Sequence, residues 1–231
     1  MENRNPVFTI FLETGQKKTF AGAIEWPGWC RSGSDESAAL QALLDCAPRY
    51  ALALQGSGLG FAPPASLADF AVVQRLPGST TTDFGAPDAE LDGDRLPLDA
   101  AGFARGRAIL EAGWMALENA ARDAAGRELA RGPRGGGRDL DKLIAHTVEA
   151  QRAYLGRLGW KSALPAGADP TALLQAIRQD TLAAMAAAEA GVLPERGPRG
   201  GALWPLPYFF RRAAWHILDH AWEIEDRLAP Q

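Results

Sequence analysis

Three histidines are the residues of this chain best suited to chemistry, and the sequence contains no others. His216 and His220 stand four residues apart in the segment WHILDHAWEIEDR, and His146 stands in the segment LDKLIAHTVEA. On an α-helix, residues four apart lie on one face, one turn from each other, so two such imidazoles can bind one metal ion. We therefore interpret the three histidines as candidate ligands of a divalent metal, with three unrelated residues at the edge of a core as the alternative.

Two helices must position these histidines. The sequence pattern predicts one helix over 139–158, which carries His146, and another over 205–228, which carries His216 and His220. In an up-and-down bundle these two helices, the second and the fourth, run parallel and begin at the same end. With a rise of about 1.5 Å per residue, all three imidazoles then reach a similar depth. Two helices can thus present three histidines to one ion.

Three imidazoles with an open fourth position are typical of catalytic zinc sites. Nickel and other divalent ions also accept imidazole ligands, so the residue types leave zinc or nickel open. Such an ion lowers the pKa of a bound water, or holds a thiolate or a carbonyl oxygen. Glu149 and Glu223 each follow a histidine by three residues. Either carboxylate could orient a ligand or act as a general base, and the alternative for each is a solvated surface charge.

The hexapeptide RGPRGG occurs twice, at 131–136 and 196–201, shortly before the two helices that carry the histidines. Its glycines and prolines suit tight turns between helices. Its arginines can also form a rim that attracts a bound anion beside two helix N-termini. The arginines of this predicted rim are Arg131, Arg134, Arg196 and Arg199.

The expected fold class is α+β, with a small N-terminal antiparallel sheet and one helix followed by an antiparallel four-helix bundle. β-Prone runs over 7–14 and 17–26 predict a hairpin, and a third strand is expected around 70–75. Between them, Ser34 is expected to cap a helix that Pro48 kinks or interrupts.

We predict a small α+β domain over 1–76, a linker over 77–97 and a helical bundle over 98–231. The linker is acidic and rich in turn-forming residues, whereas only helical patterns follow it. The predicted bundle helices span 98–129, 139–158, 169–190 and 205–228. Asp139 and Asp169 are suited to cap the second and third of them.

Composition and charge exclude several classes of function. A net charge of −4 opposes broad attraction to nucleic acid or to an anionic membrane. No apolar run approaches the roughly 20 residues that a membrane span needs, and the N-terminal residues do not resemble a secretion signal. Two cysteines, Cys30 and Cys46, are too few for a disulfide framework and are typical of a reducing compartment. We therefore expect a cytoplasmic protein.

Two segments, DLDKLIAHTVEAQRAYLGRLGW and RRAAWHILDHAWEIEDR, resemble the DinB-like superfamily of metal-binding four-helix bundles. That superfamily includes thiol-dependent transferase and maleylpyruvate isomerase branches. The resemblance covers roughly 98–231 and implies that His146, His216 and His220 occupy its metal-ligand positions, usually for zinc or nickel. The run IEWPGWCRSGSDESAALQALLDCAPRYALAL is similar to HicB-like small α+β modules, and this likeness implies only a fold.

Two functions follow as expectations. The first is a metal-dependent enzyme, either a transferase that activates a small thiol or a hydrolase. Its expected partners are a small-molecule substrate or a thiol cofactor, without nucleic acid or membrane, and a homodimer is left open. The second is a non-enzymatic stress-response or partner-binding module, in which the metal only stabilises the helices.

Overall fold

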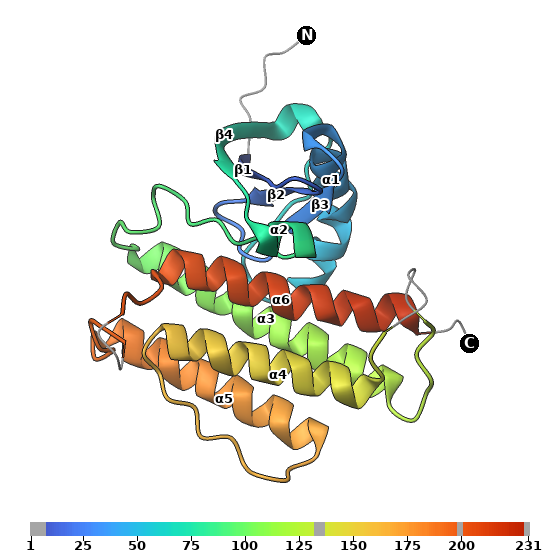
Figure 1. Cartoon of the computed structure of the whole chain (residues 1–231), viewed down its shortest axis with the longest axis vertical. Coiled ribbons are helices and arrows are strands. Elements are labelled where there is room, and N and C mark those ends of the chain that lie inside the picture. Colours follow the sequence, from blue (N-terminus) through green and yellow to red (C-terminus); the bar gives the residue numbers. More distant parts are fainter. Residues whose placement is uncertain (1–7, 132–136, 198–200, 229–231) are drawn as a thin grey trace. The chain divides into compact units, whose positions relative to one another are not determined.

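The structure is a computed structural model that describes residues 8–131, 137–197 and 201–228. Three strands, a helix and a fourth strand come first, and only helices follow (Figure 1). The expected α+β class is confirmed. Across the described residues, no helix combines the length and the apolar character that spanning a membrane requires.

The chain divides into two compact units, and each is described by itself. One unit comprises Met1–Ala112 together with Phe210–Trp215, and the other comprises Gly113–Phe209 together with His216–Gln231. Helices α3 (Ala100–Ala124) and α6 (Leu206–Arg227) therefore contribute residues to both units.

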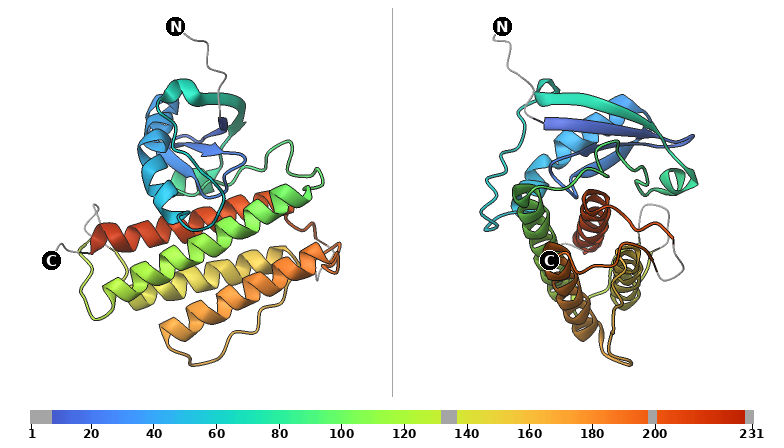
Figure 2. Two further views of the ribbon diagram at one scale, coloured as in Figure 1. Left: turned by 180° about the vertical axis from the view of Figure 1, so that it is seen from behind. Right: turned by 90° about the vertical axis from the view of Figure 1, so that its left-hand side faces the viewer.

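The first unit contains a four-stranded mixed sheet in the order β3–β2–β1–β4. The expected hairpin is confirmed, because β1 (Phe8–Thr14) pairs antiparallel with β2 (Thr19–Ala23). By contrast, β1 pairs in parallel with β4 (Phe70–Pro77), so the sheet is not antiparallel as expected (Figure 2). The reason is the connection: the chain leaves β3 at one edge, crosses along a helix and enters the other edge in the same direction.

Strand β3 (Cys30–Gly33) and helix α1 (Glu36–Ala53) differ from the expectations in three respects. The sequence around β3 is dominated by turn formers and predicts no strand, yet β3 pairs with β2. The cap of α1 is Asp35 and not Ser34, since the Asp35 carboxylate accepts a hydrogen bond from the backbone N–H of Ala38 at 2.9 Å. The helix also continues through Pro48 instead of restarting there.

Both faces of the sheet are covered, which explains why every residue of β2 is buried. On one face α1 is joined to the β2–β3 connection by the Trp29 indole N–H, which donates to the Leu43 carbonyl at 2.9 Å, and by the Tyr50 hydroxyl, which donates to the Pro27 carbonyl at 2.8 Å. A separate buried cluster brings strand residues together with one residue of the segment 77–97 and one of α6. Its members are Phe11, Phe20, Cys30, Leu91 and Trp215.

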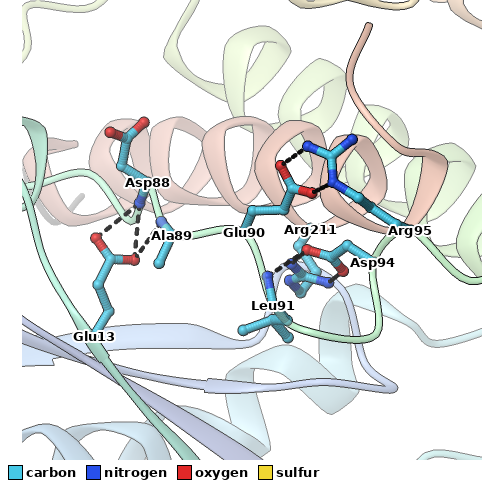
Figure 3. Close-up of polar contacts among 8 residues, drawn as sticks. All are labelled: Glu13, Asp88, Ala89, Glu90, Leu91, Asp94, Arg95 and Arg211. Carbon is cyan, nitrogen blue, oxygen red and sulfur yellow. Dashed lines mark hydrogen bonds and ion pairs between the residues drawn. The ribbon is translucent and has the colours of Figure 1, made fainter. Parts of the chain in front are cut away.

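Residues 77–97, predicted to be a linker, contain the short helix α2 (Thr80–Phe84) and are held by a buried carboxylate (Figure 3). Glu13 on β1 is fully buried. Its oxygens accept hydrogen bonds from the backbone N–H groups of Asp88 and Ala89 at 2.9 Å and from the Thr82 hydroxyl. An anionic acceptor in the sheet thus orders a segment whose composition alone indicates a flexible connection.

We predict that Glu13→Gln lowers the free energy of unfolding by about 2–3 kcal/mol, because an amide directs its own N–H groups toward donors that need an acceptor. Urea denaturation followed by tryptophan fluorescence measures the loss. Glu25→Gln, the same change at an exposed position, is the matched control. Equal stability of the two variants would contradict a role for Glu13 in holding this segment.

The second unit is helical throughout its described elements. The predicted helices correspond to α3, α4 (Leu140–Arg157), α5 (Pro170–Glu189) and α6. The expectation that the second and fourth of them run parallel from the same end is wrong. Arg227 at the end of α6 bonds the Arg138 carbonyl just before α4, and the Trp204 N–H just before α6 donates to the Arg157 carbonyl at the end of α4, so the two helices run antiparallel. Both predicted caps are confirmed: the Asp139 carboxylate accepts from the Lys142 N–H at 2.9 Å and the Asp169 carboxylate from the Ala172 N–H at 3.0 Å.

Several contacts join these helices within the second unit. Helices α4 and α5 pack side by side (Figures 1 and 2). Arg178 on α5 forms an ion pair with Glu118 on α3 at 3.0 Å. At Gly113 on α3, an added Cβ would lie 3.4 Å from Cγ2 of Ile217 on α6, so these helices approach closely.

Candidate metal centre

The structure brings the three histidines together. His146 comes from α4, while His216 and His220 come from successive turns of α6. The Nε2 atoms of His216 and His220 are 3.2 Å apart, and each of the three residues offers a nitrogen within 4.8 Å of the other two. The His146 ring centroid lies 5.4 Å from that of His216 and 5.1 Å from that of His220.

This spacing fits a shared metal ion. Two nitrogens that each bind zinc at about 2.0–2.1 Å in a tetrahedral arrangement lie roughly 3.3 Å apart, close to the 3.2 Å between the two α6 histidines. The same separation also fits an N–H···N hydrogen bond between the rings. His146 favours the shared ion, because a third nitrogen converging on the same place completes a ligand set that a hydrogen bond between two rings does not need.

Burial affects the protonation of His146. His216 and His220 are buried, whereas His146 is half-buried. Burial lowers the pKa of His146, and the positive charge of Arg138 and the neighbouring His220 lower it further, against a smaller opposite effect of Glu223. The lowered pKa favours the neutral imidazole, which is the form that binds metal.

Glu223 orients His220. A carboxylate only accepts hydrogen bonds, so the 2.9 Å contact between Glu223 Oε2 and His220 Nδ1 places a proton on Nδ1. In the neutral ring Nε2 is then the nitrogen able to bind a metal, and it faces His216. The hydrogen bond from His220 lowers the pKa of Glu223, with a further contribution from Arg227, and burial partly opposes the shift. The carboxylate is therefore ionised and well suited to hold a ligating imidazole.

Glu149, the other candidate carboxylate, lies on the exposed side of α4. It forms an ion pair at 2.7 Å with Arg152, three residues further along the helix. No described contact joins it to the histidines. Of the two glutamates, only Glu223 has a described hydrogen bond to a histidine.

The predicted arginine rim is only partly described. Arg131 and Arg196 are exposed. They belong to connectors at opposite ends of α6, since Ala130 pairs with Arg227 at its last turn and Trp204 precedes its first turn, so these two arginines do not form one rim. Arg134 and Arg199 lie outside the described residues. Arg227, which the sequence analysis does not select, bonds the Glu223 carboxylate that holds His220, and its position four residues after Glu223 is a spacing typical of helical ion pairs.

Aromatic side chains border one side of the histidine cluster. The Tyr154 ring on α4 stands edge-on to the His216 ring, with centroids 5.6 Å apart. The Trp204 ring follows at 5.2 Å from Tyr154, and the Tyr208 ring lies 4.8 Å from that of Trp204. These rings support the position of His216 by packing.

Comparison of the chain with protein-family models, with curated proteins and with solved structures gives no match.

Proposed function

We propose that the chain binds one divalent transition-metal ion, zinc or nickel, through His146, His216 and His220. One observation carries this proposal: nitrogens from all three side chains lie within 4.8 Å of one another, two of them at the separation of neighbouring zinc ligands. The lowered pKa of His146 supports it because it favours the neutral imidazole that binds metal, and the carboxylate on His220 Nδ1 supports it because it orients that ring.

We further propose that the site is catalytic and that the chain is a transferase dependent on a small thiol. Three protein ligands leave a fourth tetrahedral position for a substrate, and a bound ion supplies Lewis acidity toward a thiol or a carbonyl oxygen there. Half-buried His146 is the ligand best placed to border that position. The resemblance to DinB-like proteins, with α3–α6 as their antiparallel four-helix bundle, supports the same assignment.

Burial of the α6 ligands supports the alternative of a structural metal in a non-enzymatic module. His216 and His220 are 6% and 8% exposed, and His220 is tied to the helix end through Glu223 and Arg227. A metal held only for stability would be enclosed and would not exchange readily with small thiols.

Elemental analysis of the purified chain tests metal binding directly. We expect one equivalent of zinc or nickel per chain after mild reconstitution, with a dissociation constant in the micromolar range or tighter. If the reconstituted protein keeps less than about a tenth of an equivalent, and calorimetry detects no binding of either ion, the metal-site proposal is wrong.

A second comparison separates the catalytic site from the structural one. A catalytic metal predicts thiol-dependent turnover with a panel of electrophiles, and a modest change in melting temperature when a chelator removes the ion. A structural metal predicts a large drop in melting temperature and no turnover. The presence of both a large drop and turnover would retain the enzyme and add a stabilising role.

A further inference from the structure

Arg227 uses its whole guanidinium group at the end of α6. Its Nη1 donates to Glu223 Oε1 at 2.8 Å, its Nε to the Ala130 carbonyl at 2.8 Å, and its Nη2 to the Arg138 carbonyl at 2.7 Å. The residue is only 7% exposed. Each nitrogen of the buried fork thus has an acceptor, and the acceptors come from a side chain and from two separate backbone positions.

The same two stretches of chain also pair through their backbones. The Ala130 N–H donates to the Arg227 carbonyl at 2.7 Å, and Leu129 and Leu228 form an isolated antiparallel bridge. Ala130 and Arg138 stand on either side of the first RGPRGG copy. Arg227 therefore binds the α3–α4 connector at both of its ends, and it does so from the last turn of α6, the helix that carries His216 and His220.

We propose that Arg227 is a positioning residue for His220, an inference that rests on the proposed metal site. The chain of contacts is continuous: two backbone carbonyls hold Arg227, Arg227 holds one oxygen of Glu223, and the other oxygen holds His220 Nδ1. Without the guanidinium, Glu223 is free to leave His220, and the ring loses the contact that selects its tautomer. The connector thereby sets the geometry of the site without contributing a ligand.

Lysine cannot replace arginine in this role. The three acceptors lie in different directions, and the planar guanidinium meets all of them with fixed N–H groups, whereas an ammonium is a single point. Carboxylates and other partners that orient a metal ligand typically contribute 10–100-fold to metal affinity. We therefore expect Arg227→Lys to weaken zinc binding by that factor, although it keeps the charge.

Gly137 offers a second way to disturb Arg227 without touching it. A Cβ at this position would lie 2.6 Å from Arg227 Nη2, and the backbone φ of +141° is itself unfavourable for alanine. Gly126 is the matched control in the same connection: its φ is +72°, and nothing lies within 4 Å of its added Cβ. Gly137→Ala combines strain with a collision at the guanidinium, whereas Gly126→Ala introduces strain alone.

The experiment measures zinc affinity by chelator competition for wild type, Arg227→Lys, Glu223→Gln, their double variant, Gly137→Ala and Gly126→Ala. We expect a 10–100-fold loss for Arg227→Lys, a similar loss for Glu223→Gln, and no further loss in the double variant, because the two act through one contact. Gly137→Ala should fall between wild type and Arg227→Lys, and Gly126→Ala should bind as wild type. A folded Arg227→Lys within twofold of wild type, or additive losses in the double variant, would overturn the inference.

A metal-free readout keeps this test separate from the proposed metal site. Long-range ¹H–¹⁵N NMR of the three histidine side chains reports the tautomer of each ring. In the metal-free wild type we expect His220 to carry its proton on Nδ1, and in Arg227→Lys a mixture of both tautomers. An unchanged His220 tautomer in the folded variant refutes the positioning role even if the wild type binds no metal, and a wild type without metal affinity refutes only the site.

Discussion

His216→Ala should reduce metal binding from one equivalent to a trace, with an affinity loss greater than about 100-fold. Removing a ligand deletes one of three nitrogens, whereas losses of 10–100-fold already follow from disturbing groups that merely orient a ligand. His216 is central to the cluster, since its Nε2 lies 3.2 Å from that of His220 and its ring contacts that of His146. Elemental analysis and competition with a chromogenic chelator give the two numbers.

Glu149→Gln is the control for this experiment. Glu149 lies on the same helix as His146 but is exposed and paired with Arg152, so its variant should keep full metal content. Circular dichroism of His216→Ala must show the helical content of the wild type, because an unfolded variant would lose metal for a trivial reason. A folded His216→Ala that still binds one equivalent at wild-type affinity would show that the three rings do not share an ion.

The histidine cluster could be predicted from sequence because it depends on local periodicity. His216 and His220 share a face by helical spacing alone. The caps are equally local: Asp139 caps α4 and Asp169 caps α5, each by accepting a hydrogen bond from the backbone N–H three residues further on. The approach of His146 was expected from the assumption that its helix and α6 run parallel from the same end, and that assumption is wrong, because α4 and α6 run antiparallel. The three imidazoles still reach a similar depth, because His146 stands six residues after the start of α4 and His220 stands seven residues before the end of α6, and these two helix ends lie together.

The remaining contacts of the site could not be predicted in this way. The bonds of Arg227 to the carbonyls of Ala130 and Arg138 join positions 97 and 89 residues apart. No periodic pattern encodes such a contact. Backbone carbonyls are present at every residue, so their use by a distant arginine leaves no mark in the sequence.

The sheet was mispredicted for a related reason. Hairpins are set by local turn chemistry, and the β1–β2 pair was found, but the pairing of β1 with β4 depends on where a long crossover returns. Likewise, the acidic composition of 77–97 indicated a linker, although Leu91 lies in a hydrophobic cluster and Asp94 is 2% exposed. Composition reports the average polarity of a segment and does not predict single buried contacts, such as those of Glu13 and Asp94, that order it.

Asp94 carries the second large effect that we predict: Asp94→Asn should lower the free energy of unfolding by about 3–5 kcal/mol. Arg211 Nη1 and Nη2 bind the two Asp94 oxygens at 2.5 Å (Figure 3). The Arg211 guanidinium also lies over the Phe11 ring, 5.7 Å from its centroid. Both charged residues are buried, so neutralising the carboxylate leaves a cation that water cannot reach. The carboxylate also accepts the Leu91 N–H at 2.7 Å, which adds to the loss.

Asp92→Asn, the same change two residues away at an exposed position, should alter stability by no more than about 0.5 kcal/mol. Urea denaturation of the two variants gives the comparison, and similar midpoints would mean that the ion pair does not hold the segment.

The double variant Asp94→Leu with Arg211→Met separates the effect of charge from the effect of packing, since removing both charges avoids the cost of a buried guanidinium without a carboxylate partner. It should therefore be more stable than Asp94→Asn. A double variant as unstable as the single one would place the effect in packing around Leu91 and not in the buried charge.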